Sequence, residues 1–64
     1  MAKVNAADLI GLNEEEVVNN LRRLGFYTRI VARDGKDFVH TAEANSHRFN
    51  LEITKNKVTG AFQG

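Results

Sequence analysis

The sequence predicts an α+β fold in which a single helix packs on a small mixed sheet of parallel and antiparallel strands. One segment has the apolar spacing of a helix, and the segments after it are rich in β-branched and aromatic residues, as strands are. The last two strand-like segments are separated by a tight turn, which predicts an antiparallel pair. A much longer stretch separates the first two, which predicts a parallel pair.

Length and composition predict one domain, residues 1–64, with a small core. The chain contains no cysteine, so its stability depends on packing of the helix against the sheet. The formal net charge is +1 and the basic residues are dispersed, which argues against nucleic acid as a partner. No apolar run approaches the roughly 20 residues that cross a bilayer, so we expect no membrane association. No signal peptide is visible, which predicts a cytoplasmic location.

The N-terminal part of the chain predicts a loose segment followed by a helix. Residues 1–7 are small and polar, and we expect them to form the loose segment. The helix is predicted over residues 14–24. Asn13 is a suitable N-cap, and Glu16 follows it at the spacing of a capping box.

An apolar stripe indicates which face of this helix is buried. Its members recur at helical spacing and are Val17, Val18, Leu21 and Leu24. Gly25 follows the stripe where a left-handed C-terminal cap is expected. Arg22 and Arg23 complement the helix dipole near the C-terminal end.

The first strand is predicted over residues 26–33. Strict alternation would place Arg29 and Arg33 on one face and Phe26 and Ile30 on the other.

The second and third strands are predicted over residues 48–54 and 58–62. In the second strand apolar and polar residues alternate, and Phe49, Leu51 and Ile53 share one face. Gly60 within the third strand indicates a bulge or a close backbone approach. As a C-terminal edge strand, this segment leaves dimerisation open.

Residues 34–47 form a long segment between the first two strands, within the stretch DGKDFVHTAEANSHR. They are too many for a hairpin loop and show no helical stripe. We therefore expect an extended crossover loop between parallel strands. Unstructured loops of more than about 12–15 residues are uncommon in compact domains and are often functional.

The loop offers little for catalysis or metal binding. His40 and His47, with Glu43 between them, match no established ligand spacing. Ser46 beside His47 lacks a nucleophile elbow, and so small a core leaves little room for a pocket. We expect no enzymatic activity, no catalytic residue, no metal and no cofactor.

Arginines interleaved with aromatic residues in LRRLGFYTR give a weaker alternative, which is nucleic-acid binding through Arg22, Arg23 and Arg29. The acidic residues Glu14, Glu15 and Glu16 on the same helix offset this charge, and a solvated helix face explains the pattern equally well.

The order of segments resembles that of the potato inhibitor I family. LIGLNEEEVVNNLRRLG is followed by a strand, a long loop, HRFNLEI, a short turn and a terminal VTGAFQG. The loop length and the RFNLEI run look closer to the small bacterial-type relatives of barley chymotrypsin inhibitor and eglin. The resemblance extends from Leu9 to Gly64.

This resemblance implies a serine protease inhibitor that acts as a pseudo-substrate. The implied protease-binding loop is Thr41, Ala42, Glu43, Ala44 and Asn45. Ala42 would be the primary specificity residue and Ala42–Glu43 the scissile bond. Because Ala42 is small, the implied partner is a subtilisin-like or elastase-like serine protease.

The resemblance also implies two residues that support the loop, Arg48 and Asn50. Arg48 would bond Thr41, Glu43 or nearby carbonyl groups, and a charge-assisted bond to Glu43 would restrain the leaving group. Ala44 replaces the aromatic residue usual in the family. The alternative is therefore a small intracellular protein-interaction module with the inhibitor fold and no inhibitory activity.

Overall fold

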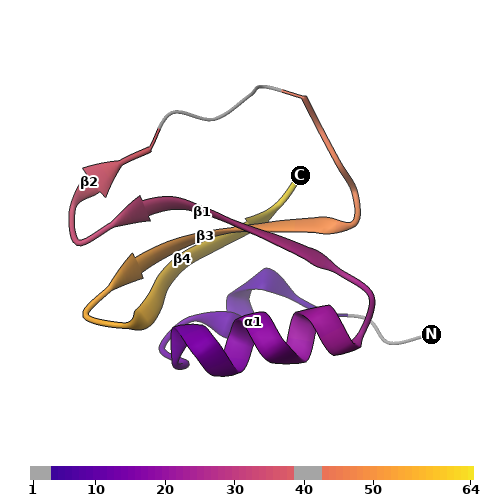
Figure 1. Cartoon of the computed structure of the whole chain (residues 1–64), viewed down its shortest axis with the longest axis horizontal. Coiled ribbons are helices and arrows are strands. Elements are labelled where there is room, and N and C mark those ends of the chain that lie inside the picture. Colours follow the sequence, from indigo (N-terminus) through magenta and orange to yellow (C-terminus); the bar gives the residue numbers. More distant parts are fainter. Residues whose placement is uncertain (1–3, 39–42) are drawn as a thin grey trace.

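The computed structural model describes residues 4–38 and 43–64. Its elements are the 3₁₀ helix η1 (Ala6–Leu9), helix α1 (Glu14–Arg23), and strands β1 (Tyr27–Arg33), β2 (Lys36–Asp37), β3 (Arg48–Thr54) and β4 (Lys57–Gln63). The strands form one sheet in the order β2-β1-β3-β4, in which β1 and β3 run parallel and the other neighbours antiparallel. Helix α1 packs on one face of this sheet (Figure 1). The predicted α+β class, with one α-helix on a small mixed sheet, is confirmed.

Two short elements lie in segments that the sequence predicted as irregular. Residues 6 and 7 of the expected loose N-terminus belong to η1. The expected 34–47 loop begins with a turn and then contains β2. The turn forms because Asp34 and Gly35 both have positive φ, 51° and 81°, which matches the tight turn of a two-residue hairpin.

Helix α1 begins after a residue that accepts hydrogen bonds from its first backbone N–H groups, and it ends before a glycine whose conformation cannot continue the helix. The Asn13 Oδ1 atom accepts hydrogen bonds from the backbone N–H groups of Glu15 (3.0 Å) and Glu16 (3.4 Å), as expected of an N-cap. At the other end Gly25 has φ +93°, a conformation that glycine adopts without strain. The helix therefore stops at Arg23, one residue before the expected end.

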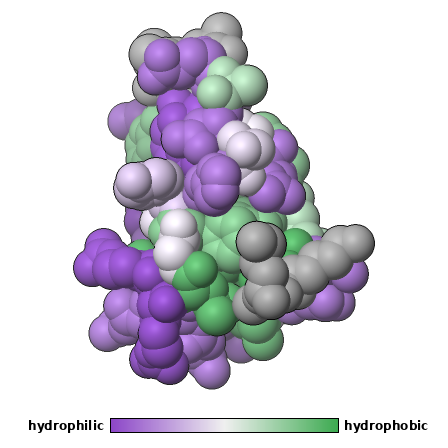
Figure 2. All heavy atoms as spheres, turned by 90° about the vertical axis from the view of Figure 1, so that its right-hand side faces the viewer, coloured by the Kyte–Doolittle hydropathy of each residue, from purple (hydrophilic) through white to green (hydrophobic). Residues whose placement is uncertain are grey.

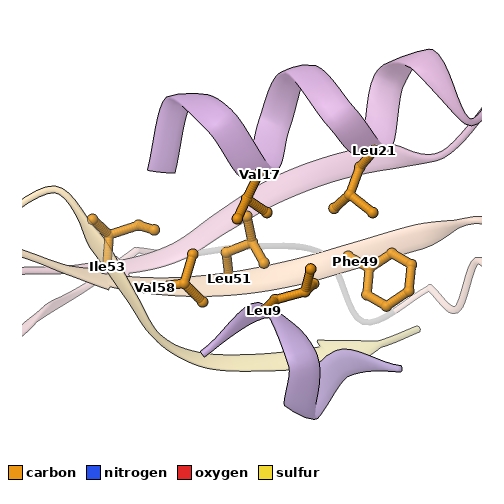
Figure 3. Close-up of a cluster of buried hydrophobic side chains, with 7 residues drawn as sticks. All are labelled: Leu9, Val17, Leu21, Phe49, Leu51, Ile53 and Val58. Carbon is orange, nitrogen blue, oxygen red and sulfur yellow. The ribbon is translucent and has the colours of Figure 1, made fainter. Parts of the chain in front are cut away.

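The core lies between α1, η1 and the sheet (Figure 3). Its buried members are Leu9, Val17, Leu21, Phe49, Leu51, Ile53 and Val58. Phe26 packs edge-on against Phe49, with ring centroids 5.1 Å apart. Leu24 was predicted to share the buried stripe, but its side chain is 49% exposed because it lies beyond the last helical turn.

A bulge in β1 changes the face on which its last residues lie. Ile30 pairs with Leu51 and Ala32 with Glu52, so Val31 is an extra residue. The bulge places Arg33 on the α1 side of the sheet, where both of its terminal nitrogens donate to the Glu14 carboxylate at 2.7 Å. Arg29 remains on the opposite face, so the prediction that these two arginines share a face is wrong.

A second bulge lies in β4, where Glu52 pairs with Gly60 and Ile53 with Val58. The extra residue is Thr59, directly before Gly60, where the sequence indicated a bulge or a close backbone approach. A Cβ atom on Gly60 would lie 2.9 Å from the Glu52 Oε2 atom, so the close neighbour is a side chain rather than backbone.

The outer edge of β4 is partnered near its start. Gly11 N–H donates to the Val58 carbonyl (2.7 Å), and Val58 N–H donates to the Leu12 carbonyl (2.9 Å). The residues that precede α1 therefore shorten the open edge on which the sequence left dimerisation open.

Figure 2 shows the face that lies to the right in Figure 1. Apolar residues gather in its lower part, on the side of the sheet that carries α1, and hydrophilic residues dominate the upper, loop side. Within residues 4–38 and 43–64, no helix has the length and apolar character needed to span a bilayer.

The difference in burial predicts a large loss of stability at one leucine of the stripe and a small loss at another. Leu21→Ala, which empties a site that is 1% exposed, should lower the free energy of unfolding by about 2–5 kcal/mol. Leu24→Ala at the exposed helix end is the matched control and should cost no more than about 0.5–1 kcal/mol. Urea unfolding followed by circular dichroism measures both. Equal costs would contradict the packing described for α1.

The contact between Glu14 and Arg33 predicts an acid-dependent loss of stability. Hydrogen bonds from Arg33 lower the pKa of the Glu14 carboxyl from its ordinary 4.5. The contact therefore stabilises the folded protein above pH 4.5, and this contribution is lost as the pH falls through the lowered pKa. Glu14→Gln should unfold with a weaker dependence on pH below 4.5 than the parent protein.

Glu16→Gln is the matched control for this measurement, because it removes a charge from the same helical turn and leaves the Arg33 contact in place. Thermal unfolding between pH 2 and pH 7 should separate the two variants. Identical pH profiles for Glu14→Gln and the parent protein would show that the contact adds nothing to stability.

Candidate functional site

The described arms of the crossover between β1 and β3, residues 34–38 and 43–47, lie on the side of the sheet opposite α1 (Figure 1). The crossover's predicted binding residues Thr41 and Ala42 fall outside the described residues, as does His40. The structure does describe the segments on both sides, from Asp34 to Phe38 and from Glu43 to His47. Hydrogen bonds attach both arms to the sheet.

The N-terminal arm of the loop is attached along β1. Ala32 pairs with Asp37 and Arg33 with Lys36, and Phe38 N–H then donates to the Val31 carbonyl at 2.9 Å. These antiparallel pairs fix the direction in which the chain leaves the sheet.

The turn that precedes this arm is fixed to the neighbouring hairpin. The Asp34 Oδ1 atom accepts a hydrogen bond from Lys55 N–H (2.8 Å), and Asp34 N–H donates to the Ile53 carbonyl (2.8 Å). Lys55 and Asn56 form the turn between β3 and β4, and both have positive φ. The start of the crossover is therefore bonded to two strands that are distant in sequence.

The C-terminal arm is organised by Asn45. Its Oδ1 atom accepts from His47 N–H (2.8 Å), and its carbonyl accepts from Arg48 N–H (3.1 Å). Such local bonds from an asparagine side chain are typical of turns. The His47 carbonyl in turn accepts from Tyr27 N–H at 2.7 Å, which joins the end of the arm to β1.

Arg48 connects this arm to the end of β4. Its Nη2 atom donates to the Glu43 carbonyl at 2.7 Å and its Nε atom to the Gly64 carbonyl at 3.1 Å. The Gln63 side-chain amide donates to the Ser46 carbonyl. The Arg48 guanidinium therefore lies between the loop and the C-terminal strand and bonds both. Its contact with Glu43 is to the backbone carbonyl, which is one of the partners that the resemblance implied.

Asn50 shares the Gly64 carbonyl with Arg48 and is almost completely buried, at 1% exposed. Its Oδ1 atom accepts from Arg29 Nε (3.0 Å), and its Nδ2 atom donates to the carbonyls of Gly64 (2.9 Å) and Phe62 (3.4 Å). In the described part of the chain every buried side-chain nitrogen and oxygen has a hydrogen-bond partner. Asn50 is thus a satisfied polar group that joins β1, β3 and β4.

We call Arg29, Arg48, Asn50 and Gly64 the support network. Arg48 and Asn50 were expected as support residues, whereas Arg29 was considered only for nucleic-acid binding. The alternation of β1 and β3 puts Arg29 and Asn50 on the same face of each strand, but the register that makes them neighbours appears only in the fold. Nothing in the sequence pattern pointed to the carbonyl of Gly64.

The remaining loop residues are exposed to different degrees. Glu43 and Ala44 are exposed and Asn45 is half-buried. Ser46 Oγ lies 3.4 Å from His47 Nδ1, and both side chains are exposed. Among residues 4–38 and 43–64, no group of three or more histidine, cysteine or acidic side chains is placed to hold a metal ion.

Comparisons of the chain with protein-family models, with curated proteins and with solved structures find no match.

The support network predicts a cost for removing its buried amide. Asn50→Ala leaves the Arg29 Nε group and the Gly64 carbonyl without their buried partner, so the free energy of unfolding should fall by about 1–3 kcal/mol. Asn20→Ala on the exposed face of α1 is the control and should change it by no more than about 0.5 kcal/mol. Equal stabilities of the two variants in urea unfolding would refute a stabilising role for the network.

Proposed function

We propose that this protein inhibits serine proteases by presenting its crossover loop as a pseudo-substrate. The residues that would enter the protease are Thr41, Ala42, Glu43, Ala44 and Asn45, with Ala42–Glu43 as the scissile bond. The observation that carries the proposal is the Arg48 contact with the Glu43 carbonyl, which restrains the loop immediately after that bond.

A pseudo-substrate must remain in the shape that the protease binds, because a flexible segment pays a large ordering cost on binding. The attachment of both arms supports this requirement. The N-terminal arm pairs with β1 through β2 and Phe38, and the C-terminal arm is held by Asn45 and Arg48. An extended segment held in this way can add to the protease cleft as a strand through its backbone groups.

The position of Arg48 also favours inhibition over cleavage. Attack on the Ala42 carbonyl would release the amino group of Glu43 as the leaving group. The Arg48 guanidinium holds the Glu43 carbonyl at 2.7 Å, so this new amino group would stay close to the acyl-enzyme and re-form the peptide bond. A hydrogen bond from a charged guanidinium is stronger than one between neutral groups.

The rest of the support network restrains Arg48 itself. Its Nε atom is bonded to the Gly64 carbonyl, and that carbonyl is also bonded by the buried Asn50. The guanidinium is therefore positioned from the sheet and is not free to follow the loop outward.

Titration against subtilisin and pancreatic elastase, with the protein followed by mass spectrometry, tests the proposal. We expect inhibition accompanied by slow cleavage at Ala42–Glu43 alone. Rapid cleavage within the loop without inhibition would refute it and would favour the alternative, a protein-interaction module with this fold and no inhibitory activity. Replacing Ala42 by residues of increasing size should change which protease is inhibited.

Loss of Arg48 should convert an inhibitor into a substrate. Arg48→Ala removes charge-assisted hydrogen bonds, so the inhibition constant should rise about tenfold to a hundredfold and hydrolysis of Ala42–Glu43 should accelerate. Arg23→Ala at the exposed end of α1 is the matched control and should leave inhibition unchanged. Unchanged potency of Arg48→Ala would refute the support role while leaving inhibition itself intact.

A further inference from the structure

The outer edge of β1 is only partly covered by β2. β2 pairs with Ala32 and Arg33, and Phe38 N–H reaches the Val31 carbonyl. The preceding part of the edge, residues 28–30, has no neighbouring strand within the described part of the chain. An uncovered strand edge can receive a strand from another molecule.

The hydrogen bonds of the parallel ladder show which groups this edge presents. Tyr27 N–H donates to the His47 carbonyl, and in a parallel pair alternate residues bond to the same neighbour. The backbone groups of Tyr27 and Arg29 therefore point toward β3, and those of Thr28 and Ile30 point outward. These outward groups have no partner within residues 4–38 and 43–64.

One basic side chain, Arg22, lies beside the start of this edge. A surface depression adjoins the start of β1, and its lining residues are Arg22, Gly25, Phe26, Tyr27 and Thr28. Arg22 is the charged residue among them, and no acidic side chain lines the depression. The Tyr27 side chain is 66% exposed and provides an aromatic surface beside this charge.

We propose that the edge formed by Thr28 and Ile30 binds an extended acidic segment of a partner protein, which adds to the sheet next to β1. The outward backbone groups provide the strand pairing, and Arg22 provides the preference for acidic side chains. This second interaction does not depend on inhibition.

A second copy of this chain fits the same edge poorly. Antiparallel self-pairing that uses Thr28 and Ile30 of both copies places Arg29 directly opposite its counterpart, and like charges in that position are destabilising. The edge of β4 is a weaker candidate, because Gly11 and Leu12 already occupy it at Val58.

The test titrates the ¹⁵N-labelled protein with an acetylated and amidated hexapeptide of alternating glutamate and valine. We expect the amide resonances of Thr28 and Ile30 to shift and the affinity to fall as salt is added. A peptide with lysine in place of glutamate should bind at least about fivefold more weakly. No shift at these residues at millimolar peptide, shifts confined to the loop or β4, or equal binding of the lysine peptide would overturn the proposal.

Thr28→Pro tests the strand pairing at this edge most directly. The Thr28 N–H points outward, so proline removes the donor for the added strand without removing a bond to β3. Thr28→Val retains the N–H and is the matched control. Thr28→Pro should weaken binding at least about fivefold and Thr28→Val should not. Equal affinity of the two variants would overturn the edge assignment.

Two further measurements test the edge without relying on Thr28→Pro. If Thr28→Pro fails to fold, N-methylation of the backbone of the peptide removes the same hydrogen bonds and should abolish binding by the parent protein. Sedimentation equilibrium of the parent protein alone should show a monomer. A dimer whose contacts map to Thr28 and Ile30, or tighter binding of a single-stranded oligonucleotide at these residues, would assign the edge to a different partner and overturn the proposal.

Discussion

The parallel pairing of β1 with β3 is the constraint on which the rest of the structure depends. Parallel strands cannot be joined by a tight turn, so the chain must return across the sheet before β3 can begin. α1 covers one face of the sheet, and the described parts of the return path, residues 34–38 and 43–47, lie on the opposite side (Figure 1). The long loop is therefore a consequence of strand direction, and its two ends lie near opposite ends of the central strands.

The same pairing explains why a polar network lies under the loop. It places Arg29 of β1 beside Asn50 of β3, on the face away from the apolar core, and β4 brings the Gly64 carbonyl to the same place. Burying an amide is costly unless its groups are bonded, and the bonds to these partners offset that cost. Arg48 then extends the network to the loop. In a domain with a small core and no disulfide, these bonds link the described part of the loop to β1, β3 and the end of β4.

The sequence predicted the elements more accurately than their junctions. The N-cap at Asn13 and the glycine after α1 could be predicted because both act through the local backbone. The bulge at Val31 could not, because it arises from the register of β1 against a strand that lies about 20 residues later in the chain. That single extra residue moved Arg33 to the helix side and made the contact with Glu14. The exposure of Leu24 could not be predicted for a related reason, because apolar spacing does not show where the sheet stops covering the helix.

For the site, the sequence by itself determined which residue types are present, the alternation that puts Asn50 opposite the apolar face, and the need for a crossover of this length. Those features depend on the period of a strand and on the reach of the chain, which are local properties. Only the tertiary structure decided that Arg48 bonds the Glu43 carbonyl, that Arg29 braces Asn50 and that the end of β4 completes the network. These contacts join residues from different strands, and their geometry is set by register and packing across the sheet, which no single segment encodes.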